Sequence, residues 1–352
     1  MQTLPARFAV RAARIKMKIV VLDGDVINPG DISWAPLEKL GEVAIYGDTP
    51  EDLIVERAAG AEVLVTNKVP LRSGTLSRLP DLRMVAVLAT GYDIIDTADA
   101  AAHGIPVCNV VAYGVDDVAQ HAWALLLELC RRTGEHTASV CAGEWKDTWC
   151  YWKTTPVCLR GRTLGVIGFG SIGRRVGELG HAFGMSVLAN CRTPRNPPSY
   201  SPFAFASTDQ IFQQADVISL HCPLSEESYH MLDREAFDKM KKGVFLLNTS
   251  RGALIDSEAL LDALNNGTLR GAGLDVYEEE AKFFFEDHSD TAVQDDTLAL
   301  LISRPNVILT AHQAFLTEEA LYNIAEVTVQ NLDDFFAGKP LKNEVCIRCA
   351  GN

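Results

Sequence analysis

The stretch TLGVIGFGSIG, residues 163–173, decides how the middle of this chain folds. It begins with apolar residues typical of a buried strand and continues into three glycines with the spacing G-x-G-x-x-G: Gly168, Gly170 and Gly173. The apolar residues that follow recur at helical spacing: Ile172, Val176, Leu179 and Phe183. A glycine-rich turn between a strand and a helix is the context in which this motif binds a dinucleotide. The alternative is a turn of the same shape without a ligand.

Each glycine of the motif has a separate reason to be there. Gly168 permits the tight turn, Gly170 lets a pyrophosphate approach the backbone, and Gly173 lets the helix pack closely on the strand. The amino end of the helix then faces the phosphates, because its N–H groups and its dipole attract anions. We therefore expect the first helical residues to contact the cofactor as well: Ser171 and Ile172.

Strand-like runs alternate with helical patterns on both sides of the motif. The first set of strands is predicted at 17–22, 43–46, 62–65 and 84–88. The second set is predicted at 163–168, 186–190, 216–220, 244–248, 271–275 and 307–310, with helices at 171–184, 233–241 and 256–266. Strands that alternate with helices form parallel sheets through right-handed crossovers. The sequence therefore predicts an α/β protein with two doubly wound parallel-sheet domains, and residues 116–133 predict a long buried helix between the two sheets.

Composition excludes several classes of protein. The 352 residues are too many for one ordinary core, and 47% of them are apolar while 22% are charged, as in globular domains. No run approaches the ~20 apolar residues of a membrane span, so we expect no membrane partner. The net charge of -14 argues against a nucleic-acid partner, since a surface that binds a duplex is basic.

The cysteines and the first residues bear on the compartment. The nine cysteines are scattered and odd in number, which predicts a reducing compartment, and we expect the cytoplasm. Cys346 and Cys349 form a lone C-x-x-C, a weak signal without a second pair, and we expect no metal site. Residues 1–16 carry four basic residues and no acid, so organellar targeting is an alternative. We favour a poorly ordered extension, because Met17 opens a complete strand.

The residues after the second strand of the central domain bear on the choice between NAD and NADP. An Asp or Glu at this place, about 20 residues beyond the glycines, would bind the ribose hydroxyls of NAD. The chain has Cys191, Arg192 and Thr193 there. No Asp or Glu occurs between Glu178 and Asp209. An arginine beside a hydroxyl suits a 2′-phosphate, so we expect NAD(P)H as cofactor, with NADPH favoured over NADH. The alternative is that Arg192 stacks on the adenine.

Polar residues follow the later strands of the second set. They occur in four segments: HCPL at 221–224, NTSRGALID at 248–256, LDVYEEE at 274–280 and AHQAF at 311–315. Ligands of open parallel sheets bind at the carboxyl ends of the strands. A single histidine after a strand is more often structural, but here Arg251, a carboxylate and His312 should meet in one crevice. At the same edge we expect cofactor contacts from His221, Cys222, Pro223, Thr249, Ser250 and Asp275.

With these motifs the chain resembles the D-isomer-specific 2-hydroxyacid dehydrogenases over about residues 17–345. The resemblance implies a flavodoxin-like substrate domain made from both ends of the chain, residues 17–115 and 316–346. It also implies a central NAD(P)-binding Rossmann domain, residues 116–315. A homodimer is expected as the assembled form.

The resemblance also implies which residues carry the catalysis: Arg251, Glu280 and His312. Glu278 and Glu279 are alternatives for the middle role. Glu280 is preferred because AKFFFEDHSD follows it directly, as in the fermentative D-lactate dehydrogenases.

The residue types suit the reduction of a 2-keto acid, which needs a hydride at the carbonyl carbon and a proton at its oxygen. Histidine titrates near neutral pH, so His312 can supply the proton. Glu280 beside it would orient the ring and favour the imidazolium. Arg251 can hold the substrate carboxylate with paired hydrogen bonds and polarise the carbonyl.

Two subfamilies are combined in the chain. From about residue 216 onward, FFFEDHSD and HQAFLTEEAL resemble fermentative D-lactate dehydrogenases. The earlier NKVPL, ATGYD and AYGVDDVAQHA resemble glycerate dehydrogenases, also called hydroxypyruvate reductases. We expect the reduction of pyruvate to D-lactate, with hydroxypyruvate or glyoxylate reduction as the alternative. A remote alternative is a dinucleotide-sensing scaffold like the corepressors of the family.

The resemblance also implies the residues that contact the substrate. Backbone amides would hold its carboxylate at Thr90, Gly91 and Tyr92. Tyr113 would contact the substrate, and Phe315 would close the other side of the pocket. For these two aromatic residues, packing in the core is the alternative.

Overall fold

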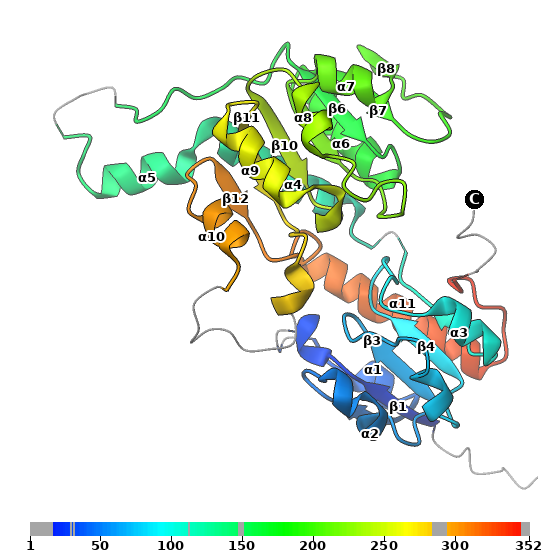
Figure 1. Cartoon of the computed structure of the whole chain (residues 1–352). Helices are drawn as coiled ribbons and strands as arrows, with labels where there is room; N and C mark the ends of the chain where they lie inside the picture. The colour runs from blue at the N-terminus through cyan, green and yellow to red at the C-terminus, as the bar shows by residue number, and fades with distance from the viewer. Residues whose placement is uncertain are drawn as a thin grey trace, which may run out of the picture. The chain divides into compact units, whose positions relative to one another are not determined.

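The computed structural model describes residues 17–28, 30, 32–111, 113–146, 151–283 and 294–345. The predicted extension at 1–16 and the Cys346/Cys349 pair lie outside the described residues. The chain divides into two compact units (Figure 1). The first unit comprises Met1–Tyr113 with Leu321–Asn352, and the second unit comprises Gly114–Ala320.

The first unit contains a parallel sheet of five strands in the order β2-β1-β3-β4-β5, which is the flavodoxin-like order. The strands are β1 (Met17–Val21), β2 (Gly41–Ile45), β3 (Val63–Thr66), β4 (Met84–Val87) and β5 (Val107–Cys108). Its helices are α1 (Ala35–Glu38), α2 (Ile54–Arg57), α3 (Thr97–Ala102) and, from Leu321 onward, α11 (Glu318–Phe336). Every residue of β3 and β4 is buried, as expected for strands of a parallel sheet that is covered on both faces.

The second unit contains a parallel sheet of seven strands in the order β12-β11-β10-β9-β6-β7-β8. The strands are β6 (Thr163–Ile167), β7 (Ser186–Asn190), β8 (Phe203–Phe205), β9 (Val217–Leu220), β10 (Val244–Asn248), β11 (Leu269–Leu274) and β12 (Val307–Leu309). The strand order reverses between β6 and β9, and the carboxyl ends of strands at such a switch point are where Rossmann sheets bind ligands. The predicted fold class, with two doubly wound parallel sheets, is confirmed.

The helices of the second unit include the four that the sequence predicts and three that it does not. They are α4 (Val115–Arg131), α5 (Thr133–Cys141), α6 (Ser171–Ala182), α7 (Thr208–Gln214), α8 (Arg234–Asp238), α9 (Ser257–Asn265) and α10 (Asp296–Ile302). The long helix predicted at 116–133 is α4, with Leu125 and Leu126 buried. A Cβ at Gly273 of β11 would lie 2.9 Å from the Cβ of Leu125, so glycine at this position allows α4 to lie close to the sheet.

Two strands were not predicted, β5 in the first unit and β8 in the second. The short strand β8 directly follows residues 193–202. A strand of three residues gives too short a pattern to detect. Its aromatic side chains pack against Phe169 of the glycine turn, with ring centroids 5.3 Å away for Phe203 and 5.9 Å away for Phe205. The short strand thus ties the loop after β7 to the glycine turn.

Candidate active site

The glycine turn between β6 and α6 is tight and opens onto space. Gly168 has a φ of +95°, and a Cβ there would lie 2.4 Å from backbone atoms of His221 and Cys222. A Cβ at Gly173 would lie 2.1 Å from the carbonyl oxygen of Gly168, so a side chain would push α6 away from β6. A Cβ at Gly170 would meet no other described atom within 4 Å. Space therefore remains at the amino end of α6, where the pyrophosphate of a dinucleotide fits.

The segments after β9 and β10 add polar groups to this edge of the sheet. The backbone N–H of His221 donates to the carbonyl oxygen of Ile167, the last residue of β6 (2.7 Å). Burial lowers the pKa of the His221 ring to about 4, so the ring is neutral at physiological pH. Ser250 Oγ donates to the carbonyl oxygen of Cys222 (2.6 Å). The hydroxyl of Thr249 is buried without a hydrogen-bond partner among the described residues, which suits a polar ligand there.

The end of β7 presents a positive charge and no carboxylate. Asn190, its last residue, donates from Nδ2 to the carbonyl oxygen of Ala206 (3.0 Å). Cys191 is half-buried, and Arg192 and Thr193 are exposed. The guanidinium of Arg192 forms no hydrogen bond or ion pair with another described residue, so it is available to an anion. The end of β7 therefore offers a cation and no carboxylate to a ligand.

Asn248, at the end of β10, shapes the turn that carries Arg251. Its side chain is fully buried, accepts from the backbone N–H of Ser250 (3.0 Å) and donates to the carbonyl oxygen of Arg251 (2.9 Å). Gly252 follows, and a Cβ there would lie 2.1 Å from the backbone of Tyr277. The turn after β10 therefore packs directly on the segment after β11, which leads to Glu280.

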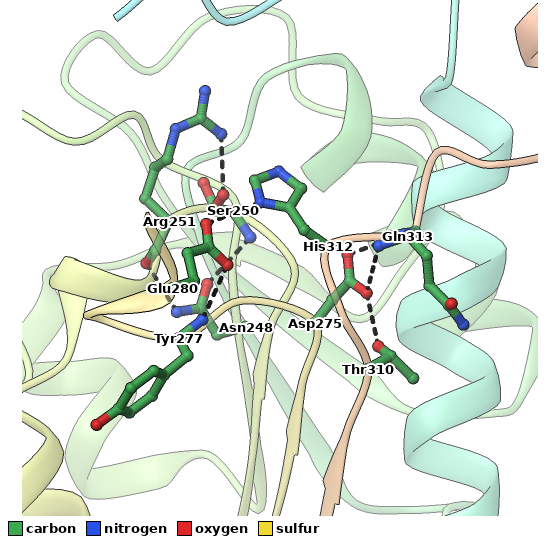
Figure 2. A network of polar contacts seen from close by, with 10 residues as sticks. Asn248, Ser250, Arg251, Asp275, Tyr277, Glu280, Thr310, His312 and Gln313 are labelled. Atoms are coloured by element: carbon green, nitrogen blue, oxygen red, sulfur yellow. Dashed lines mark hydrogen bonds and ion pairs between the residues drawn. The ribbon is translucent and has the colours of Figure 1, made fainter. Parts of the chain in front are cut away.

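Glu280 and His312 are in direct contact. The two side chains come from segments that follow the neighbouring strands β11 and β12, and Arg251 comes from the segment after β10 (Figure 2). His312 Nδ1 lies 2.8 Å from Glu280 Oε1, and both side chains are about one-fifth exposed. Glu280 Oε2 also accepts from the backbone N–H of Tyr277 (3.2 Å). A carboxylate at this distance orients the imidazole ring.

The two alternative carboxylates pair elsewhere. Glu278 Oε1 lies 2.5 Å from His230 Nε2. Glu279 lies 2.7 Å from Lys282 Nζ in an exposed ion pair. Among the three glutamates, the structure therefore places Glu280 against His312.

Asp275 holds the backbone around His312. Its carboxylate is almost fully buried and accepts from Thr310 Oγ1 (2.6 Å) and from the backbone N–H groups of Gln313 (2.9 Å) and Ala314 (2.8 Å). Its carbonyl oxygen accepts from the N–H of His312 (2.7 Å). Figure 2 shows these bonds around the turn. His312 has a φ of 50°, a left-handed conformation that is uncommon for histidine, and the bonds to Asp275 hold the turn in it. The sequence did not predict this role, and a cofactor contact of Asp275 stays a prediction.

The residues expected to contact the substrate are divided between the two units. The first unit contains Thr90, Gly91, Tyr92 and Tyr113, and the second contains Phe315. Thr90 Oγ1 donates to the carbonyl oxygen of Val110 (2.8 Å), and the carbonyl oxygen of Thr90 accepts from Asn109 Nδ2 (2.8 Å). The loop after β4 is thus tied to the loop after β5, while its contacts with a substrate stay a prediction.

Metal sites and membrane-spanning helices are both absent from the described residues. No group of three or more His, Cys, Asp or Glu side chains in the described ranges could hold a metal ion. None of the helices in the same ranges is both long enough and apolar enough to cross a membrane.

Comparison with known proteins identifies a family. Residues 123–314 match the family described as D-isomer specific 2-hydroxyacid dehydrogenase, NAD binding domain. The chain is 38% identical over 330 residues to a hydroxypyruvate reductase of Blautia hydrogenotrophica, covering 92% of this chain and 98% of that protein. It is 39% identical over 264 residues to a D-lactate dehydrogenase of Escherichia coli, covering 75% of this chain and 79% of that protein.

A solved structure extends the comparison to the whole fold. The crystal structure of D-lactate dehydrogenase from Aquifex aeolicus, complexed with NAD and lactic acid, has a TM-score of 0.83 and 30% sequence identity. The match covers 93% of this chain and 98% of that chain. The predicted resemblance is confirmed: this chain belongs to the D-isomer specific 2-hydroxyacid dehydrogenases, oxidoreductases that act on 2-hydroxy and 2-keto acids with a nicotinamide dinucleotide.

Proposed function

We propose that the chain reduces a short 2-keto acid to the D-2-hydroxy acid, with Arg251, Glu280 and His312 as the reacting set. The observation that carries this proposal is the 2.8 Å contact between His312 Nδ1 and Glu280 Oε1 at the end of two neighbouring strands. Arg251 follows the next strand of the same sheet. A proton donor, a carboxylate that orients it and a cation for the substrate are therefore presented at one sheet edge.

Each residue has a step that its chemistry suits. A reduced nicotinamide dinucleotide, with its pyrophosphate held at the glycine turn, would supply the hydride. Because Nδ1 of His312 faces Glu280, Nε2–H is the group that donates the proton to the carbonyl oxygen of the substrate. The Glu280 carboxylate, in contact with Nδ1, keeps the ring oriented during the transfer. Arg251 binds the substrate carboxylate with two parallel hydrogen bonds and stabilises the negative charge that develops on the carbonyl oxygen.

We also propose that residues of the first unit contribute to substrate binding. The backbone amides at Thr90, Gly91 and Tyr92 would share the carboxylate with the arginine, and Tyr113 and Phe315 would limit the size of the side chain. The domain roles follow: residues 17–115 with 316–346 bind the acid, and residues 116–315 bind the dinucleotide.

Two short acids are candidates as the preferred substrate. Residues from about 216 onward favour pyruvate, as argued from the sequence. Hydroxypyruvate is favoured by the similarity to the Blautia hydrogenotrophica relative. That protein is named hydroxypyruvate reductase and is matched over 98% of its own length. Both acids have side chains small enough for a pocket that is closed by two aromatic residues.

A panel of 2-keto acids tests this proposal. We expect kcat/KM for pyruvate or hydroxypyruvate to exceed that for phenylpyruvate and 2-ketoisocaproate by at least about tenfold, because each added methylene group must be accommodated. The rate is followed by the loss of absorbance of the reduced nicotinamide. A preference of tenfold or more for either bulky acid would refute the assigned pocket, and no turnover with any acid would refute the activity.

The second part of the proposal is that NADPH is used at least as well as NADH, because Arg192 pairs with the 2′-phosphate. A charge-assisted hydrogen bond contributes ~1.5–3 kcal/mol, or about 10–150-fold in affinity before solvent screening. Cys191→Asp should shift the preference toward NADH, since its carboxylate accepts from the ribose hydroxyls and repels the phosphate.

The measurement is kcat/KM with NADPH and with NADH at fixed salt, for the wild type, for Cys191→Asp and for the control Cys158→Asp. Cys158→Asp is the matched control, because Cys158 is an exposed cysteine that precedes β6, and its cofactor ratio should equal that of the wild type. A wild type that strongly prefers NADH, together with an unchanged ratio in Cys191→Asp, would remove Arg192 from phosphate recognition.

We further propose a homodimer in the cytoplasm. Val140 of α5 and Trp145 and Trp152 beyond it are 43%, 49% and 59% exposed, and a second copy of the chain would cover these apolar side chains. The described cysteines are free thiols, as expected in a reducing compartment: Cys108, Cys130, Cys141, Cys158, Cys191 and Cys222.

A further inference from the structure

Glu278 lies two residues before Glu280, and its carboxylate joins segments that are far apart in the sequence. Its Oε1 lies 2.5 Å from Nε2 of His230. Its Oε2 accepts from the hydroxyl of Ser257 (2.8 Å) and from the backbone N–H of Ser257 (3.2 Å). The side chain of Glu278 is only 17% exposed. A carboxylate that is this buried is stabilised by such charge-assisted bonds, and both of its oxygens take part.

The segments that meet at Glu278 include the turn of Arg251. The backbone N–H of His230 donates to the carbonyl oxygen of Ala253 (2.9 Å), and the N–H of Leu232 donates to that of Leu254 (3.0 Å). Ser257 begins α9, which follows the same turn. Residues 252–257 are therefore held on one side by the His230 segment and on the other by Glu278.

A second contact brings the same two segments together. Gly252, next to Arg251, packs so closely on the peptide between Tyr277 and Glu278 that a Cβ would lie 2.1 Å from one of its atoms. The bonds of the Glu278 carboxylate and this backbone contact act in parallel. Together they fix the distance from the segment of Arg251 to the segment of Glu280.

We propose that Glu278 is a positioning residue for catalysis, and this inference rests on the proposed roles of Arg251, Glu280 and His312. By holding the turn of Arg251 against the segment of Glu280, it sets where the substrate carboxylate lies relative to the proton donor. A displacement of about 1 Å at a reacting group can cost as much as about 10²-fold in rate. The role is thus separate from that of Glu280, which touches His312 directly.

Glu278→Gln tests the inference, because it keeps the size of the side chain and removes its charge. The amide oxygen can still accept from Ser257, but the carboxylate oxygen that faces His230 Nε2 is replaced by an amide nitrogen. We expect kcat for the 2-keto acid to fall about tenfold and KM to rise, while the Kd of the reduced nucleotide stays within about twofold of the wild type. Glu279→Gln is the matched control, since Glu279 pairs only with Lys282 in the described part of the chain, and we expect wild-type kinetics from it.

Rates are expressed per active site, counted by nucleotide titration, so that a loss of folded protein alone leaves kcat and KM unchanged. Glu278→Gln is also combined with Arg251→Lys. In Arg251→Lys, the substrate carboxylate is no longer bound in bidentate fashion. The further loss of activity that Glu278→Gln causes in this background should therefore shrink to about twofold or less. Wild-type kcat and KM in Glu278→Gln, or losses that multiply in the double variant, would overturn the inference.

A second variant keeps the test decisive if Glu278→Gln does not fold. His230→Asn removes the partner of Glu278, and asparagine tolerates the φ of 48° at this position. It should lower kcat and raise KM in the same manner, and wild-type kinetics would count against the inference. If His312 and Arg251 variants lose activity while Glu278 and His230 variants do not, the proposed function stands and the inference alone fails. If His312 variants keep full activity, it is the proposed function that fails.

Discussion

His312→Asn is expected to lower kcat for the 2-keto acid by ~10²–10⁴-fold, the usual contribution of a general acid. The asparagine side chain cannot donate a proton to a developing alkoxide at neutral pH. Asparagine tolerates the positive φ that His312 adopts, so the turn held by Asp275 should keep its shape. The Kd of the reduced nucleotide should change by less than about twofold, because the ring acts on the carbonyl group and not on the phosphates.

The measurement is steady-state turnover together with a fluorescence titration of the reduced nucleotide. His103→Asn is a suitable control, because His103 follows α3 in the first unit, whereas Arg251, Glu280 and His312 all belong to the second unit. A His312→Asn enzyme with more than about a tenth of the wild-type kcat would reject the assigned proton donor.

Arg251→Lys is expected to lower kcat/KM by about 10²-fold, with most of the loss in KM and part in kcat. A guanidinium matches a planar carboxylate with two parallel hydrogen bonds, whereas an ammonium is a point charge on a flexible chain. The loss of one charge-assisted hydrogen bond of ~1.5–3 kcal/mol accounts for about 10–150-fold. Part of the loss reaches kcat, because the same arginine stabilises charge on the carbonyl oxygen.

The Arg251 variant is compared with Arg234→Lys, in which an exposed arginine of α8 is replaced. Arg234 pairs with Asp262 at the surface, so its replacement should leave both kinetic constants unchanged. Arg251→Lys kinetics within about threefold of the wild type would contradict the role of Arg251 at the substrate carboxylate.

The fold could be predicted from the sequence wherever elements were long and periodic. Long runs such as VFLLN are apolar on both faces of the sheet, and α4 shows a clear apolar stripe. The three residues of β8 and the mostly exposed α5 were missed, because neither gives an apolar period. The glycine turn was predictable because the G-x-G-x-x-G spacing is required only where a strand, a tight turn and a helix pack closely together.

The sequence suggested the proposed reactive residues but not the residues that hold them. Arg251 and His312 lie in polar segments that directly follow apolar strands, so their residue types already suggest catalytic roles. The sequence predicts Asp275 as a cofactor contact and Glu278 as an alternative to Glu280. Their bonds run to residues 310–314 and to His230 and Ser257, and such contacts between distant segments leave no periodic pattern in the sequence.

The central claim is that this chain forms D-2-hydroxy acids, and the configuration of the product tests it most directly. Pyruvate or hydroxypyruvate is incubated with NADPH and the enzyme, and the hydroxy acid is separated on a chiral column. The account predicts the D-isomer alone, in an amount equal to the nucleotide oxidised, and no such product from His312→Asn at matched times. Formation of the L-isomer or of a racemate, or an equal yield from the His312 variant, would contradict it.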